Sequence, residues 1–200
     1  MRSKIINELM NQIKKYNDFD DIKLKEIKYG LETIYLTIIK TIIFIILAMF
    51  INTVKELLLF LLFYGIIRLT GFGVHAIKSI HCWIASIIIF ILTPLLIKYS
   101  DFPNIIIYMF ILISNIFIIL YAPADTPKRP LKNKKKRIRY KIITLIISTI
   151  YSSIILMTNI IVLKNSLLYS LILESFLVTP FIYKLFGVSY KNYEIRKEMK

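Results

Sequence analysis

The sequence predicts an all-α, polytopic integral membrane protein, with about six transmembrane or membrane-embedded helices, the second one short, and an N-terminal amphipathic helix. The composition is 57% hydrophobic with a mean hydropathy of +0.67, which is too apolar for a soluble domain. The chain nevertheless carries 27 Lys and Arg against 12 Asp and Glu, a formal charge of +15. Apolar helices joined by basic loops on the cytoplasmic side account for both features.

The N-terminal stretch 1–16 has the pattern of an amphipathic helix. Its apolar residues recur at helical spacing: Ile5, Ile6, Leu9, Ile13 and Tyr16. A helix lying in the membrane interface and an ordinary helix packed on neighbouring segments fit this pattern equally well. Asp20 and Asp21 then predict a cap for a helix beginning at Ile22.

Apolar segments follow at about 34–51, 57–67, 83–97, 104–121, 142–163 and 166–183. Four of them are long enough to cross a hydrocarbon core of about 30 Å. The segment 83–97 is slightly short, and 57–67 is much too short to span alone at about 1.5 Å per residue. Residues 68–80 must therefore complete that crossing or lie within the membrane thickness.

The distribution of basic residues predicts the orientation. Seven Lys and Arg lie in 1–31, nine in 128–141 and five from Lys184 onward, whereas the turns at 52–56, 98–103 and 163–166 carry one each. The positive-inside rule places the first three regions in the cytoplasm, together with both termini. We therefore expect one membrane-embedded domain over 1–200: a cytoplasmic helical region 1–31, a helix bundle 32–186 with a basic cytoplasmic loop 121–141, and a cytoplasmic tail 187–200.

The single cysteine and both histidines of the chain lie in one short stretch, GFGVHAIKSIHCWIAS, residues 71–86. A helix N-terminus and an adjacent base both favour the nucleophilic thiolate. Ser79 is a candidate N-cap, which would put Cys82 in the first helical turn. Gly71 and Gly73 permit a loop that brings His75 back over the helix start, so His75 is the preferred base and His81 the second choice.

Other interpretations stay open at this point. A lone cysteine in a membrane helix is most often a small apolar filler, and histidines near an interface can simply be solvated. Three ligands at best argue against a metal site, no cofactor is expected, and little soluble surface remains for nucleic acid. A peptide exporter without covalent chemistry and a non-catalytic scaffold or sensor partner are the rival functions; both predict that Cys82 is dispensable.

The stretch RLTGFGVHAIKSIHC, 68–82, resembles the active-site motif of the accessory gene regulator B (AgrB) family, and YAPADTPKRPL, 121–131, resembles that family's basic cytoplasmic segment. The resemblance implies a membrane cysteine endopeptidase of Gram-positive quorum sensing, in which Cys82 is the nucleophile and His75 the general base. It implies an AgrD-like precursor peptide as substrate, a peptidyl thioester, a thiolactone or lactone product, and a homodimer in the cell membrane. Phe72 stands where the family commonly has the first glycine of a pair, and Gly73 keeps the second.

Several further residues have a predicted role. Arg68 either orients a substrate carbonyl or carboxylate or anchors its helix end, with Gly73 and Ser79 supporting the site. Lys40 and Glu174 lie within apolar segments, and we expect them to pair. Six residues of the basic run are predicted to bind the substrate's acidic tail, with topology and anionic lipid as the equal alternative: Lys128, Arg129, Lys132, Lys134, Lys135 and Lys136.

Overall fold

The computed structural model describes residues 2–16, 19–74, 79–127 and 130–193, apart from the side chains of 2, 22, 26 and 79–82. Within these residues all regular secondary structure is helical, which confirms the all-α part of the predicted fold class. The helices are α1 (Arg2–Tyr16), α2 (Asp21–Phe50), α3 (Val54–Gly71), α4 (Ser79–Ile87), a π-helical turn (Ile88–Leu92), α5 (Thr93–Tyr99), α6 (Asn104–Tyr121), α7 (Lys134–Met157), α8 (Ile161–Leu177) and α9 (Pro180–Leu185). The chain divides into two compact units, Met1–Phe50 and Ile51–Lys200.

The first unit consists of α1 packed on α2. Ile6 and Met10 of α1 are buried, whereas Leu9 and Tyr16 are exposed. The Asp20 carboxylate accepts a hydrogen bond from the Lys23 amide at 3.1 Å, which caps α2 as the sequence predicts. The helix continues through residue 31 without a break and is one of three helices, with α6 and α7, that are long and apolar enough to cross a membrane.

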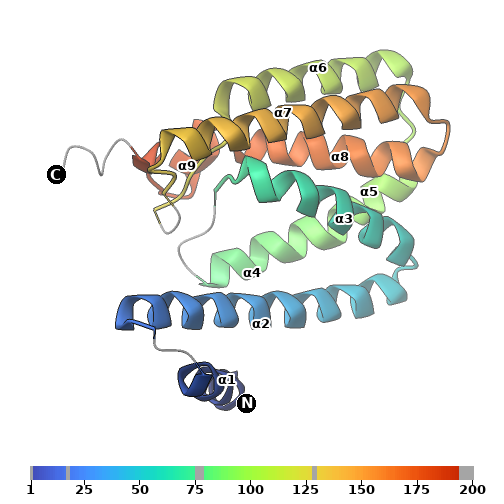
Figure 1. Ribbon diagram of the computed structural model, residues 1–200. Helices are drawn as coiled ribbons and strands as arrows, with labels where there is room; N and C mark the ends of the chain where they lie inside the picture. The colour runs from blue at the N-terminus through green and yellow to red at the C-terminus, as the bar shows by residue number, and fades with distance from the viewer. Residues whose placement is uncertain (1, 17–18, 75–78, 128–129, 194–200) are drawn as a thin grey trace. The chain divides into compact units, whose positions relative to one another are not determined.

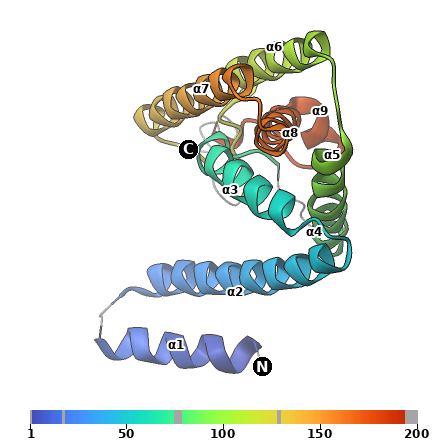
Figure 2. The same ribbon diagram turned by 90° about the vertical axis from the view of Figure 1, so that its right-hand side faces the viewer.

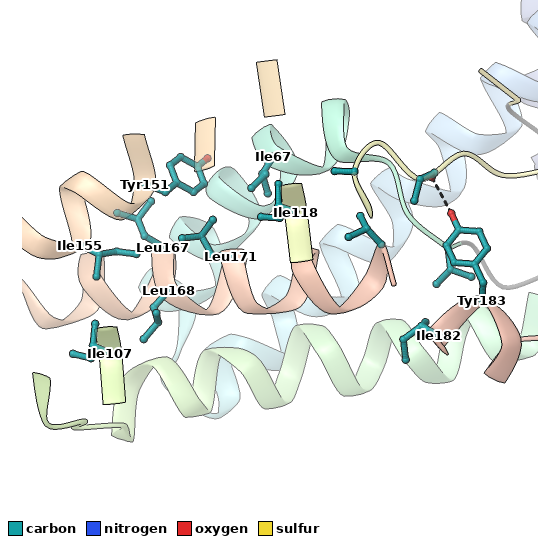
Figure 3. Packing of buried hydrophobic residues seen from close by; sticks show 14 of the residues in the cluster. Ile67, Ile107, Ile118, Tyr151, Ile155, Leu167, Leu168, Leu171, Ile182 and Tyr183 are labelled. Atoms are coloured by element: carbon teal, nitrogen blue, oxygen red, sulfur yellow. Dashed lines mark hydrogen bonds between the residues drawn. The ribbon is translucent and has the colours of Figure 1, made fainter. Parts of the chain in front are cut away.

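The second unit is built around α8. This helix packs against α3, α5, α6 and α7, and Figure 2 shows it nearly end-on with these helices around it. The buried face of α8 contributes Leu167, Leu168 and Leu171, which meet apolar side chains of α3, α6 and α7 (Figure 3). Polar contacts also join neighbouring helices: Asn115 of α6, for example, bonds to the hydroxyl of Ser152 on α7 at 2.9 Å.

Successive helices of this unit run back and forth, so its loops gather at two ends (Figure 1). At one end Asn165 donates to the carbonyls of Ile97 and Ser100, at 2.9 and 2.8 Å. At the other end the segment after α3 is hydrogen-bonded to the segment after α6 and to the end of α8. The described residues of three connecting segments lie at this second end, which we call the loop end: 72–74, 122–127 with 130–133, and 178–193.

Three predicted boundaries are wrong. The short apolar segment 57–67 is part of a longer helix, α3, with 18 residues, because this helix continues through Lys55, Glu56 and Arg68 beyond the apolar stretch. The turn expected at 163–166 lies at 158–160, where the Thr158 hydroxyl accepts from the Ile160 amide at 3.2 Å. The last apolar segment is also two helices, because α8 ends at Leu177 and Pro180 begins α9.

Candidate active site

The segment that follows α3 leads directly into the His–Cys stretch and is fixed by backbone hydrogen bonds. The Ala124 amide donates to Gly71 O at 3.0 Å, and the Gly73 amide donates back to Ala124 O at 2.8 Å. The Val74 amide donates to Leu177 O at the end of α8, at 3.1 Å. Two distant parts of the chain thus hold residues 71–74, the last residues described before His75.

An ion pair lies beneath this segment. The Arg68 Nη1 atom is 3.3 Å from Glu174 Oε2, and the Glu174 side chain is fully buried. The other terminal nitrogen, Arg68 Nη2, donates to Val74 O at 2.7 Å. The sequence predicted Lys40 as the partner of Glu174, and the structure gives it Arg68 instead. Of the two roles considered for Arg68, the structure favours anchoring, because its guanidinium ties α3 to α8 and to Val74.

The glycines on either side of Phe72 make room for this ion pair. A Cβ atom at Gly71 would lie 2.2 Å from Glu174 Oε1, and one at Gly73 would lie 2.1 Å from Arg68 Nη1 and 2.9 Å from Leu177 O. Gly73 also has a φ of +93°, which L residues rarely adopt. Phe72 has a φ of 64° as well, and its ring packs edge-on against Tyr140 of α7, with centroids 5.0 Å apart. A side chain at Gly73 would therefore meet both Arg68 and the Leu177 carbonyl, whereas one at Gly71 would have to displace the Glu174 carboxylate.

The segment after α6 is itself held firmly. The buried Tyr183 hydroxyl lies 2.8 Å from Ala124 O and 2.9 Å from Asp125 O; Figure 3 draws the first of these bonds as a dashed line. The Asp125 carboxylate accepts from the amides of Leu131 and Asn192, at 3.1 and 2.9 Å. Sequence reasoning missed Asp125 and Tyr183, although an acid within a basic loop was a visible signal for the first.

The predicted catalytic residues follow this framework. The structure begins α4 at Ser79, so Cys82 is the fourth residue of that helix and Ser79 its first residue. The side chains of Ser79, His81 and Cys82 are not described, and His75 lies outside the described residues. The cap, the nucleophile and the base therefore stay predictions.

The predicted substrate-binding residues lie partly in the described chain. Lys132, Lys134, Lys135 and Lys136 are exposed at the start of α7, where the Asn133 side chain caps the helix by accepting from the amides of Lys135 and Lys136. Lys128 and Arg129 lie outside the described residues. The four described lysines belong to the loop end, as do residues 71–74.

Comparison with known proteins extends over almost the whole chain. The family model described as "Accessory gene regulator B" matches residues 4–179. An AgrB-like protein of Clostridium acetobutylicum is 30% identical over 190 residues, covering 95% of this chain and 91% of its own length. The accessory gene regulator protein B of Staphylococcus epidermidis is 33% identical over 184 residues, covering 90% and 94%.

An AgrB-like protein of Listeria innocua is 30% identical over 183 residues, covering 90% of this chain and 88% of its own length. No solved structure matches. The family model spans both the segment 68–82 and the segment after α6, and Gly71 and Gly73 of the first are hydrogen-bonded to Ala124 of the second at the loop end. The chain belongs to the accessory gene regulator B family.

Proposed function

We propose that this protein is a membrane-embedded cysteine endopeptidase that processes an AgrD-like precursor peptide for quorum sensing. The family works with AgrD in the accessory gene regulator system. In this proposal Cys82 is the nucleophile and His75 the general base. Cleavage removes the C-terminal tail of the precursor, and the retained part closes into a thiolactone or lactone ring.

One observation carries the proposal. The segment that enters the His–Cys stretch is held by three backbone hydrogen bonds and by the Arg68 guanidinium, so the chain reaches residue 75 from a fixed point. Catalysis by a nucleophile and a base requires such placement, since a displacement of about 1 Å can cost about a hundredfold in rate. A cysteine that only fills apolar space in a membrane helix would not require the preceding segment to be held in this way.

The proposed reaction has two steps. His75 takes the proton of the Cys82 thiol, the sulfur attacks the scissile carbonyl, and the C–N bond breaks as the departing amine receives that proton. The first helical turn of α4 offers unpaired N–H groups for the developing oxyanion. His75 then takes the proton of a thiol or hydroxyl within the bound peptide, and that sulfur or oxygen attacks the thioester, which closes the ring and breaks the C–S bond to free the Cys82 thiolate. Exclusion of water within the membrane favours this attack over hydrolysis.

Substitution of the proposed dyad tests the peptidase directly. On co-expression with precursors encoded nearby, Cys82→Ala should abolish cleavage while the protein still inserts into the membrane, and Cys82→Ser should be nearly as damaging. His75→Ala should lose activity, whereas the matched control His81→Ala should keep most of it. Normal processing by the Cys82 variants would instead favour the exporter or scaffold functions.

The loop end is proposed to face the cytoplasm, because it holds the basic segment 128–141. Cys82 is the only thiol of the chain, so a membrane-impermeant maleimide should label it only after sealed right-side-out vesicles are opened. Asp101→Cys in a Cys82→Ala background should label in intact vesicles, since Asp101 is exposed and lies near the opposite end. Labelling of Cys82 from outside would overturn the six-crossing arrangement with both termini inside. The homodimer implied by the family also remains a proposal.

A further inference from the structure

A cavity of about 260 Å³ lies at the loop end, between the end of α6, the first turns of α7 and the segment after α9. Residues 121–125 line it, as do Arg137 and Lys141 of α7 and Lys191 of the segment after α9. The two cations of α7 are four residues apart, so they lie on the same face of that helix. None of the four described lysines that the sequence singled out, Lys132, Lys134, Lys135 and Lys136, lines this cavity.

The cavity has an excess of positive charge. Among the described residues, neither Arg137 nor Lys141 forms an ion pair with a carboxylate. Asp125 is the acid among the residues that line the cavity, and its two oxygens accept from the amides of Leu131 and Asn192. The Arg137 guanidinium lies over the ring of Tyr193, 3.8 Å from the centroid, which orients it without neutralising it. This excess of positive charge favours an anionic ligand, and the planar arginine guanidinium is especially suited to phosphate.

The surroundings of the cavity indicate what carries that anion. Leu120 of α6 and Ile138 of α7 line it and are also exposed, at 60% and 48%. One helical turn further from the loop end, Ile116 and Ile142 are exposed as well. Because α6 and α7 pack together and both qualify as membrane spans, an apolar track leads from the cavity along the two helices. A charged head beside an apolar track fits an amphipathic ligand better than an acidic peptide.

We propose that this cavity binds the phosphate headgroup of an anionic phospholipid, with the acyl chains lying along Leu120, Ile138 and Ile142. The cavity is of a suitable size for a headgroup alone. Its volume of about 260 Å³ is below the roughly 300–1,000 Å³ of sites that hold whole drug-sized ligands. Basic pockets between membrane helices are known places for such headgroups. Residues 121–125 line the cavity and hydrogen-bond the Gly71–Val74 segment through Ala124, so the lipid would brace the candidate active site.

The test uses the full-length protein in a neutral detergent. Thermal unfolding is followed while phosphatidylglycerol, phosphatidylcholine, inorganic phosphate or hexaglutamate is titrated in. Phosphatidylglycerol should raise the unfolding temperature at the lowest concentration. Arg137→Gln/Lys141→Gln should weaken its apparent affinity by about 25-fold, at roughly fivefold for each charge removed. Lys141→Gln alone should weaken it by about fivefold, which keeps the test open if the double variant does not fold.

The matched control is Lys134→Gln/Lys135→Gln, which removes the same charge from exposed positions on the same helix. It should weaken the affinity by less than the roughly fivefold expected for Lys141→Gln alone, since these two exposed side chains do not line the cavity and solvent and salt screen their charges. Equal weakening by both pairs would overturn the proposal in favour of general surface charge. Equal stabilisation by phosphatidylcholine or by phosphate would overturn the lipid headgroup, and stronger stabilisation by hexaglutamate would assign the cavity to an acidic peptide.

Discussion

Removal of either partner alone from the ion pair between Arg68 and Glu174 should destabilise the fold, and Arg68 should also be essential to activity. The Glu174 side chain is fully buried and the Arg68 side chain is 17% exposed, so either charge left alone is poorly solvated. Removing one partner of such a pair typically costs about 3–5 kcal/mol. We expect a loss of this size for Glu174→Leu, and the same or more for Arg68→Met, which also removes the donor to Val74 O.

The double variant separates the two roles. Replacing a buried ion pair by apolar residues of similar volume is often neutral or stabilising, so Arg68→Met/Glu174→Leu should recover most of the stability. The remaining deficit should be about 1 kcal/mol, the ordinary worth of the lost bond to Val74 O. Precursor cleavage should nevertheless stay low in the double variant, because the segment before His75 has lost its side-chain anchor.

Unfolding of the detergent-solubilised protein in SDS, followed by circular dichroism, measures these losses. Asp101→Asn is the control for removal of an exposed acid of the same unit and should change stability by no more than about 0.5 kcal/mol. Additive losses in the double-mutant cycle would refute the pairing, whereas a coupling of about 3 kcal/mol would support it. Full cleavage activity in a folded double variant would refute the positioning role of Arg68.

Two further substitutions test the same framework by SDS unfolding and precursor cleavage. Gly73→Ala should destabilise by about 1–3 kcal/mol from its left-handed backbone alone, and more from the contact with Arg68, with loss of cleavage; Gly65→Ala, which meets nothing within 4 Å, should be neutral or stabilising. Tyr183→Phe should cost about 0.5–1.5 kcal/mol, because it removes the hydroxyl bond to the Ala124 and Asp125 carbonyls, which keep the Gly73 amide and the Asn192 side chain as donors. Wild-type stability in Gly73→Ala or Tyr183→Phe would contradict the contacts described.

The fold class and the grouping of loops at one end could be predicted because they depend on local features of the sequence. Apolar runs and clusters of basic residues can be recognised from the local sequence alone, without knowledge of distant contacts. Helix boundaries were less predictable: α3 continues through Glu56, which is buried, and no glycine, proline or charge marks the turn at 158–160. The partner of Glu174 was out of reach because Arg68 lies 106 residues away, and only the packing of α3 on α8 brings them together.

The glycines near the candidate active site show how a correct signal can have a different cause. From the sequence, Gly71 and Gly73 were predicted to permit a loop. In the structure Gly71 is the last residue of α3, and its missing Cβ makes room for the Glu174 carboxylate. Gly73 does adopt a left-handed conformation, and its missing Cβ also makes room for Arg68. Because Gly71 and Gly73 pack closely against Glu174 and Arg68, they belong to a fixed connection after α3 and not to a flexible loop.

The hydrogen bonds of the segment 71–74 also indicate that this connection is fixed. Opening the segment 71–74 would break four of them: two between Ala124 and the glycines, and two at Val74, whose amide and carbonyl are both bonded. Each contributes about 0.5–1.5 kcal/mol net, and the one from the Arg68 guanidinium somewhat more. The sum is several kcal/mol, enough to keep the open form rare. The end of α3, the end of α8 and the segment after α6 therefore jointly fix where the chain enters residue 75.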